Sequence, residues 1–218
     1  MKFKNLIIAT IVSLALTACD SNDTKSPTTN ANLQNQSKSA QPVSSEEAIK
    51  NNIEKGTFHF STGKHTEDYT KKLFIFFDPQ CVHCSNLWKN LQDESLKDIN
   101  VIWIPVAVLN EKSAPQSASL LSAKEPVVLF DEHERLMSQN KVNEANLKLA
   151  EIAKNNSKQS ETELGQNTKI FMSTGATGVP LVLKLSNDKQ KVLGAPGELS
   201  VSLLNDLVKE QNQFAPKK

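Results

Sequence analysis

The chain has 218 residues, enough for one domain with a sizeable hydrophobic core or for two small ones. Hydrophobic residues make up 38% and charged residues 22%, which excludes a polytopic membrane protein and predicts a globular chain. The formal net charge is +1 and Arg135 is the only arginine, so no basic surface of the kind that binds nucleic acid is expected.

The N-terminus resembles a bacterial lipoprotein signal peptide. Two lysines precede a short apolar run over residues 6–16, which ends in Leu16-Thr17-Ala18-Cys19. The run is too short for a good membrane-spanning helix, and the tetrapeptide resembles the lipobox, whose cysteine receives diacylglycerol. The resemblance implies removal of residues 1–18 and a lipid anchor at Cys19 on the periplasmic side of a bacterial membrane. Asp20 resembles an inner-membrane retention signal, and an ordinary secretory signal with a chance cysteine is the alternative.

Residues 19–45 are predicted to form a disordered tether that links the anchor to a folded domain over 46–218. The tether is rich in Ser, Thr, Asn, Gln and Lys and has hardly an apolar side chain. It cannot bury enough surface to offset the loss of chain entropy on folding. A flexible segment of about 25 residues typically reaches about 25–30 Å.

The first half of the folded part alternates strands with helices. A helix is expected to start at Ser44 or Ser45, because acidic residues follow in its first turn. Residues 57–61 alternate as in a strand, with both phenylalanines on one face. The continuous apolar run 72–77 is typical of a strand buried on both faces, and 101–108 predicts another.

The second half is helical over about 110–176 and then returns to strands. Within the helical block, Ser160 has the spacing of a capping box at a helix start. Strands are predicted at 180–185 and 191–193, and a last helix carries an apolar stripe from 199 to 208. The order of elements indicates an α/β fold. Helical crossovers favour parallel pairing around the central apolar strand.

The chemistry of the chain is predicted to lie in Cys81-Val82-His83-Cys84, between the end of a buried strand and the start of a helix. The helix N-terminus would stabilise the thiolate of Cys81 and lower its pKa. This thiolate could attack a disulfide, and Cys84, one turn later, could resolve the mixed disulfide. His83 adds a hydrogen-bond donor and, when protonated, a positive charge that would stabilise the reduced form.

Two other roles for the Cys pair stay open. A structural disulfide closing such a small loop would contribute only about 2 kcal/mol to stability on the loop-entropy estimate. A metal site would need further ligands, and the sequence offers only scattered candidates, with copper the more suitable ion: His59, His65, His133, Met137 and Met172. Redox chemistry is the stronger prediction, and it requires no metal and no cofactor.

Other polar and aromatic residues receive structural interpretations. His133 and Arg135 lie in a charged helical stretch and are predicted to be solvated. His59 is predicted to lie on the surface of a strand. Trp88 and Trp103 are predicted to be core residues, with Trp88 also a candidate for lining a substrate groove.

Residues 76–88 resemble the active-site segment of the thioredoxin superfamily. Within it they are most similar to the periplasmic disulfide isomerases DsbC and DsbG, and to DsbG through Asp78-Pro79. The resemblance covers about 70–210 and implies a thioredoxin fold, a central mixed sheet flanked by helices, with an inserted helical subdomain over about 110–176. It also implies a cis-proline loop that faces the Cys pair and pairs with extended substrate chains, formed by Thr177, Gly178, Val179 and Pro180.

The sequence departs from the isomerases in three respects. It has too few residues before the first family-like strand for their N-terminal dimerisation domain, so a monomer is favoured. His83 before the second cysteine resembles DsbA, a strong oxidant. Val179 before the candidate cis-proline also resembles DsbA, whereas the isomerases have Thr at that position.

We therefore expect a membrane-tethered periplasmic thiol–disulfide oxidoreductase or isomerase that acts on exported proteins. Cys81 would attack, Cys84 would resolve, Val82 and His83 would tune the pair, and the loop at Pro180 would dock substrate. A membrane redox partner would recycle the pair. One alternative is a membrane-fed reductase that repairs disulfides or sulfenic acids, and another is a lipoprotein metallochaperone that carries copper or zinc on the two cysteines.

Overall fold

The computed structural model describes residues 45–185 and 192–209. The predicted signal peptide, Cys19 and nearly all of the predicted tether lie outside these residues. No helix in the described part is long and apolar enough to cross a membrane. The element that opens it, α1 (Ser45–Gly56), starts where the sequence predicts a helix start.

A five-stranded mixed sheet forms the centre of the fold, in the order β1-β3-β2-β4-β5. Its strands are β1 (Phe60–Gly63), β2 (Lys72–Phe77), β3 (Asn100–Pro105), β4 (Leu181–Leu185) and β5 (Val192–Pro196). β2 pairs parallel with β3 and antiparallel with β4. The expected parallel pairing is thus confirmed on one side of β2 only. The connection from β3 to β4 brings the chain back in the opposite direction.

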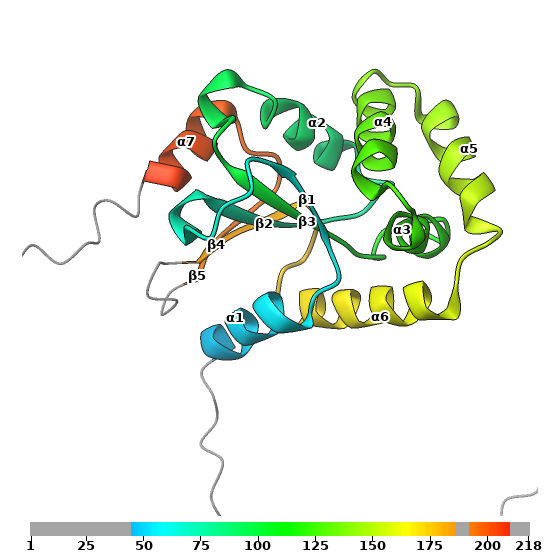
Figure 1. The fold of residues 1–218 in the computed structure, drawn as a ribbon, viewed down its shortest axis with the longest axis horizontal. Helices are drawn as coiled ribbons and strands as arrows, with labels where there is room; N and C mark the ends of the chain where they lie inside the picture. The colour runs from blue at the N-terminus through cyan, green and yellow to red at the C-terminus, as the bar shows by residue number, and fades with distance from the viewer. Residues whose placement is uncertain (1–44, 186–191, 210–218) are drawn as a thin grey trace, which may run out of the picture. The chain divides into compact units, whose positions relative to one another are not determined.

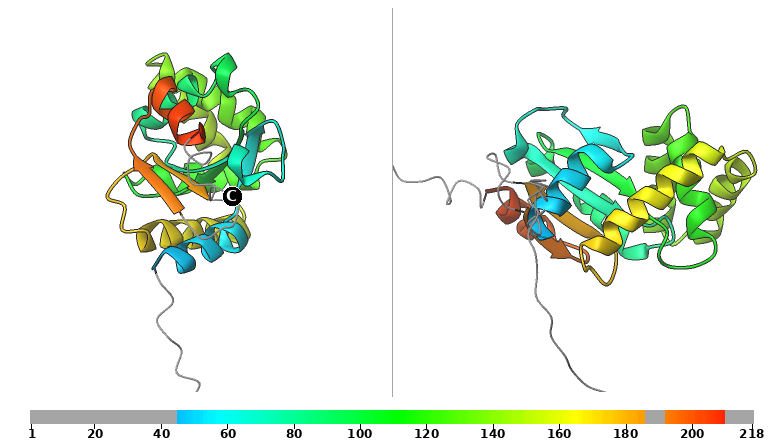
Figure 2. Two further views of the ribbon diagram at one scale, coloured as in Figure 1. Left: turned by 90° about the vertical axis from the view of Figure 1, so that its left-hand side faces the viewer. Right: turned by 90° about the horizontal axis from the view of Figure 1, so that it is seen from below.

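Helices cover both faces of the sheet (Figure 1). One face is covered by α1 and α6 (Lys158–Ser173), and the other by α2 (Val82–Asn90), α4 (Pro126–Ser138) and α7 (Val201–Lys209). The views in Figure 2 show the same two layers. Two further helices, α3 (Ser113–Ser122) and α5 (Val142–Ala153), pack beside α4, and short 3-10 turns lie at Tyr69–Lys71 and Glu94–Leu96. The segment from α3 to α6 is the helical insertion between β3 and β4.

β2 is buried along its whole length, as its apolar sequence predicts. Its alternate side chains contribute to two hydrophobic cores, one on each face of the sheet. At its end, Phe77 packs against Trp103 of β3 and Phe130 of α4, with ring centroids 5.6 and 4.9 Å apart. This aromatic cluster fixes α4 over the end of β2, where the Cys pair begins.

Several predicted boundaries were wrong. β3 ends at Pro105 and not at 108, and β5 runs to Pro196 and not to 193. β1 begins at Phe60, because the backbone of Phe58 pairs with the side chain of Asn167 instead of a strand: its N–H donates to Oδ1 (2.8 Å), and its carbonyl accepts from Nδ2 (2.7 Å). α6 begins one turn earlier than predicted, because Ser157 caps it and accepts a hydrogen bond from the Ser160 backbone N–H.

Candidate redox site at the start of α2

Cys81 is the N-cap residue of α2, directly after the turn that ends β2. Its backbone is extended, and its N–H donates to the Asp78 carbonyl at 2.9 Å. Its Sγ accepts a hydrogen bond from the Cys84 backbone N–H at 3.2 Å. The sulfur therefore lies at the positive end of the helix dipole, where unpaired N–H groups stabilise a thiolate.

The side chain of Asp78 holds this turn in place. It is fully buried, and its Oδ1 accepts from the Gln80 N–H at 2.9 Å. Its Oδ2 accepts from the N–H groups of Val108 and Leu109, at 2.9 and 3.2 Å, in the loop after β3. One carboxylate thus ties the turn before Cys81 to the neighbouring loop.

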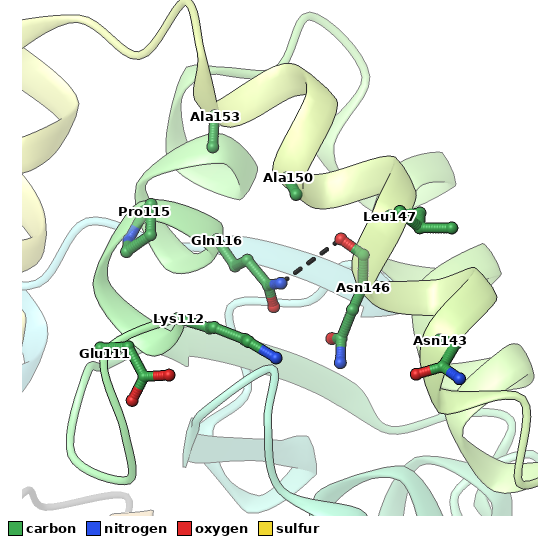
Figure 3. Close-up of a pocket in the computed structure, with 9 residues that line it drawn as sticks. All are labelled: Glu111, Lys112, Pro115, Gln116, Asn143, Asn146, Leu147, Ala150 and Ala153. Carbon is green, nitrogen blue, oxygen red and sulfur yellow. Dashed lines mark hydrogen bonds between the residues drawn. The ribbon is translucent and has the colours of Figure 1, made fainter.

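The inserted helices also hold the residue before Cys81. Gln80 Nε2 donates to Gln116 Oε1 on α3 (2.5 Å) and to Asn146 Oδ1 on α5 (2.6 Å). Figure 3 shows Gln116 and Asn146 facing each other across a groove between the two helices, with Leu147 at its edge. The groove has a volume of about 610 Å³. Gln80 therefore links the Cys turn to the helical insertion.

The two cysteines, both free thiols in this structure, have different environments. Cys81 is 6% exposed and Cys84 is 1% exposed. A hydrogen bond from the Cys84 side chain, helped by backbone N–H groups, lowers the pKa of Cys81. Burial, together with that same hydrogen bond, raises the pKa of Cys84. The arrangement makes Cys81 the better nucleophile and Cys84 the protonated partner.

The predicted cis-proline loop lies against Cys81. The Val179–Pro180 peptide is cis, and the Val179 carbonyl lies 3.4 Å from the Sγ of Cys81, which donates to it. The Pro180 carbonyl accepts from the Gly197 N–H at 2.8 Å, which joins the loop to the end of β5. Thr177 is exposed and Gly178 is half-buried. The structure thus brings this loop and the Cys pair together.

His83 and Val82 lie on the solvent side of the pair. The His83 side chain is 72% exposed, and its Nδ1 lies 3.2 Å from Glu198 Oε2, which also accepts from Asn86 Nδ2 at 3.0 Å. Val82 is exposed as well. Among the causes that lower the pKa of Cys81, the charge of His83 is the smallest.

The prediction that His133 is solvated was wrong, whereas Arg135 is exposed as predicted. His133 is 2% exposed; its Nε2 lies 2.8 Å from the Pro79 carbonyl and its Nδ1 lies 3.3 Å from the Ala145 carbonyl. Burial lowers the pKa of this histidine. The signal available in the sequence was helical spacing, because His133 lies four residues after the buried Leu129.

Sequence reasoning also missed Glu134. It is 1% exposed, and neither of its carboxylate oxygens has a hydrogen-bond partner among the described residues. Burial raises the pKa of this carboxyl group well above its ordinary value, and the charges of Cys81, Asp131 and Asp78 raise it further. An uncompensated acid therefore lies close to the Cys pair.

The described residues contain no group of three or more His, Cys, Asp or Glu side chains placed to hold a metal ion. His59 and His65 are exposed, and His59 lies just before β1 and not on the strand. Of the candidate ligands, His133 lies beside the turn before Cys81, but within this part of the chain it forms no such group with the two cysteines.

No protein-family model and no curated protein matches the chain. Several solved structures do. A periplasmic thioredoxin-like protein from Salmonella enterica serovar Typhimurium is 20% identical, with a TM-score of 0.58 over 75% of this chain and 95% of that one. The catalytic domain of Proteus mirabilis ScsC is 22% identical, with a TM-score of 0.57 over 76% of this chain and 96% of that domain. A disulfide interchange protein from Neisseria gonorrhoeae is 14% identical, with a TM-score of 0.50 over 71% of this chain and 95% of that one. The chain therefore has the thioredoxin fold with a helical insertion, as its sequence predicts.

Proposed function

We propose that the protein is a thiol–disulfide oxidoreductase in which Cys81 attacks and Cys84 resolves. The observation that carries this proposal is the place of Cys81. Its sulfur lies at the N-terminus of α2, 3.4 Å from the carbonyl before Pro180, and a buried second thiol follows one turn later. The lowered pKa of Cys81 and the raised pKa of Cys84 fit these two roles.

The exchange proceeds in two steps. The Cys81 thiolate attacks a substrate disulfide, forms a mixed disulfide and releases one substrate thiolate. The Cys84 sulfur then attacks the Sγ of Cys81, which forms the Cys81–Cys84 disulfide and releases the second substrate thiol. The substrate gains two electrons and the Cys pair loses two. The reverse sequence oxidises a substrate dithiol.

The proposed substrates are thiols and disulfides of exported proteins. The backbone beside Pro180 is proposed to pair with an extended substrate chain next to Cys81, as the resemblance implies. Two of the similar solved structures are described as a periplasmic thioredoxin-like protein and a disulfide interchange protein, which supports a periplasmic location and this chemistry. A lipid anchor at Cys19, a monomeric state and a membrane redox partner complete the proposal, and they rest on the sequence.

The direction of electron flow is decided by the reduction potential of the Cys pair. A potential near −120 mV, as for DsbA, would identify an oxidant tuned by His83 and Val179, whereas about −270 mV, as for thioredoxin, would identify a reductase. Equilibration of the soluble domain with glutathione measures this potential. Thiol labelling in cells reports the state in which the pair is kept.

Isomerase activity is the finer part of the proposal and rests on the resemblance of Asp78-Pro79 to DsbG. It predicts that the reduced protein restores activity to a substrate protein with scrambled disulfides. A reduced protein that only reduces such a substrate, without native re-pairing, would limit the function to oxidoreduction.

Trapping in cells tests the assignment of attack and resolution. Cys84→Ala should accumulate mixed disulfides between Cys81 and client proteins, because the resolving thiol is absent. Cys81→Ala is the matched control and should trap none. If Cys84→Ala captures no partner, or if both variants capture the same partners, the assignment is wrong.

A further inference from the structure

The groove between α3 and α5 is a feature of the helical insertion to which the exchange reaction has so far assigned no role. It has a volume of about 610 Å³ and runs along α5 from Asn143 to Ala153 (Figure 3). This stretch of helix is about 15 Å long at 1.5 Å per residue. An extended chain advances about 3.3 Å per residue, so the groove has room for about four or five residues of extended polypeptide.

The uncharged polar groups that line the groove are carboxamides. Gln116, which is 2% exposed, lies in the wall formed by α3, and Asn143 and Asn146 lie in the wall formed by α5. Gln116 Nε2 carries two protons, and its contact with the Asn146 backbone carbonyl is long, at 3.4 Å. Asn143 is exposed, and no hydrogen bond joins it to the other residues drawn in Figure 3. The two walls therefore offer amide donors and acceptors to a ligand in the groove.

The other lining residues indicate that this ligand is uncharged. Glu111 and Lys112, which follow each other in the chain, bring one negative and one positive charge to the groove. An acidic or phosphorylated ligand would meet a carboxylate beside the cation. Pro115, Leu147 and Ala150 add apolar surface, and Leu147 is 70% exposed. A polypeptide backbone with small or apolar side chains matches this combination of carboxamides and apolar surface.

The groove is joined to the Cys turn through Gln80, the residue before Cys81. Gln80 Nε2 donates to Gln116 Oε1 at 2.5 Å and to Asn146 Oδ1 at 2.6 Å. One carboxamide therefore contacts both walls of the groove, directly beside the attacking cysteine in the chain.

His133 joins the same turn to α5 at a neighbouring position. Its Nε2 lies 2.8 Å from the Pro79 carbonyl, and its Nδ1 lies 3.3 Å from the carbonyl of Ala145, the residue before Asn146. The α5 wall is thus held to the Cys turn at two consecutive residues of each segment. A chain bound in the groove consequently has a fixed place relative to Cys81.

We propose that the groove between α3 and α5 binds the segment of a substrate polypeptide that flanks its reactive cysteine. The inference rests on the proposed function, which brings a substrate sulfur to Cys81. The backbone of the substrate forms hydrogen bonds with the carboxamides of Gln116 and Asn143, and an apolar side chain packs against Leu147. These contacts increase the affinity for polypeptide disulfides. A small disulfide does not reach the groove and gains nothing from them.

A synthetic peptide of about eleven residues, with its cysteine at the centre, tests the groove. The peptide is capped at both ends, consists otherwise of serine and leucine, and carries thionitrobenzoate in a disulfide with the cysteine. The Cys81 thiolate of the reduced protein attacks the peptide sulfur, a disulfide between the two cysteines forms, and the coloured thionitrobenzoate leaves with its electron pair.

Two smaller disulfides serve as reference substrates. One is the same peptide cut to about one residue on either side of the cysteine, which is too short to occupy the groove, and the other is dithiobis(nitrobenzoate). With the wild type, the rate of reaction should reach half of its maximum at a concentration of the longer peptide about tenfold lower than that of the shorter one.

Filling the groove should abolish this difference. Ala150→Leu combined with Ala153→Leu places two larger side chains in the α5 wall, and leucine favours a helix almost as much as alanine does. The half-saturating concentration of the longer peptide should rise about tenfold, whereas the maximal rate and the reaction with dithiobis(nitrobenzoate) should stay within about twofold. Glu151→Leu, which adds a leucine at an exposed position of α5 outside the groove, is the matched control and should change none of these values.

Asn143→Ala provides a test that does not depend on the packing of the helices. Alanine favours a helix more than asparagine does, so a loss of fold cannot explain its effect. The half-saturating concentration of the longer peptide should rise about threefold or more, because a hydrogen bond to the peptide backbone is lost. The shorter peptide should react with this variant as it does with the wild type.

The outcomes separate the inference from the proposed function. A half-saturating concentration that is unchanged in Asn143→Ala or in the double leucine variant overturns the inference. An equal rise in Glu151→Leu, or a wild type that does not distinguish the two peptides, overturns it as well. A wild-type protein whose Cys81 reacts with none of the three disulfides would instead reject the proposed function itself.

Discussion

The two sides of the Cys pair differ in their exposure to solvent. On the exposed side, His83 projects into solvent and faces Glu198. On the buried side, formed by Asp78, His133 and Glu134, the side chains are almost completely covered. Charges in water are screened, whereas polar groups in a protein interior interact strongly and are costly to leave unpaired. We therefore expect substitutions on the buried side to change the protein much more than those on the exposed side.

The largest expected effect is that of Asp78→Ala. The variant leaves three backbone N–H groups without their acceptor, at Gln80, Val108 and Leu109. Hydrogen bonds to a charged group contribute about 1.5–3 kcal/mol each, so the free energy of unfolding should fall by about 3 kcal/mol or more. Denaturant unfolding of the reduced protein measures this loss. A change below about 1 kcal/mol would show that water replaces the carboxylate and that this part of the site is not sealed.

The next effect is that of His133→Phe, which removes both ring nitrogens but keeps the volume. The carbonyl of Pro79 loses its partner next to the Cys turn, and we expect a loss of about 1–3 kcal/mol in the free energy of unfolding. His83→Ala is the matched control on the exposed side and should change stability by no more than about 0.5 kcal/mol. Equal losses in the free energy of unfolding of the two variants would contradict the expectation that the buried side is the more sensitive to substitution.

The sequence was sufficient to predict those elements whose structure is determined by a local pattern of residues. The apolar run of β2, the Cys motif at the start of α2 and the helical block after β3 were all predictable, since each depends on neighbouring residues. The cis-proline loop followed from resemblance alone. Its contact with Cys81 joins residues 98 positions apart in the chain.

The buried side of the site was not predictable from local pattern. The stretch Asp131-Glu132-His133-Glu134-Arg135 has the composition of a solvated helix surface. Two of these five residues are nevertheless buried, because α4 docks on the end of β2 through Phe130. Local pattern favoured parallel pairing around β2, and the mixed sheet followed from the resemblance alone. The antiparallel direction of β4 depends on how the whole insertion returns the chain to the sheet.

Alkylation at different pH values should show a smaller but distinct effect at Cys81. The rate of reaction with iodoacetamide should reach half of its plateau below the ordinary cysteine pKa of about 8.5, because hydrogen bonds lower the pKa of Cys81. Cys84→Ala removes the first of these hydrogen bonds and should move the midpoint upward. A midpoint in Cys84→Ala that equals that of the wild type would show that the helix N-terminus alone stabilises the thiolate.

The same pKa shift predicts how stability depends on pH. The folded-state pKa of Cys81 lies below the unfolded value, so its contribution is fully present above the unfolded pKa and is lost as pH falls through the folded pKa. Cys84 has the opposite sign: its raised pKa favours the reduced folded state below the ordinary cysteine pKa. Comparing Cys84→Ala with the double alanine variant measures the part of the Cys81 contribution that does not depend on the hydrogen bond from Cys84.

The smallest expected effect belongs to the residue that the sequence marked as the tuner. His83→Ala should change the exchange equilibrium with glutathione by less than about threefold, because solvent and Glu198 both weaken the charge of His83 at Cys81. Glu198→Gln should shift the equilibrium slightly toward the reduced form, since it removes the competing carboxylate and leaves the positive charge of His83 available to the Cys81 thiolate. Both shifts should shrink at high salt. A change of tenfold or more in His83→Ala, retained at high salt, would mean that the exposed side sets the reduction potential and that burial of the other side serves stability alone.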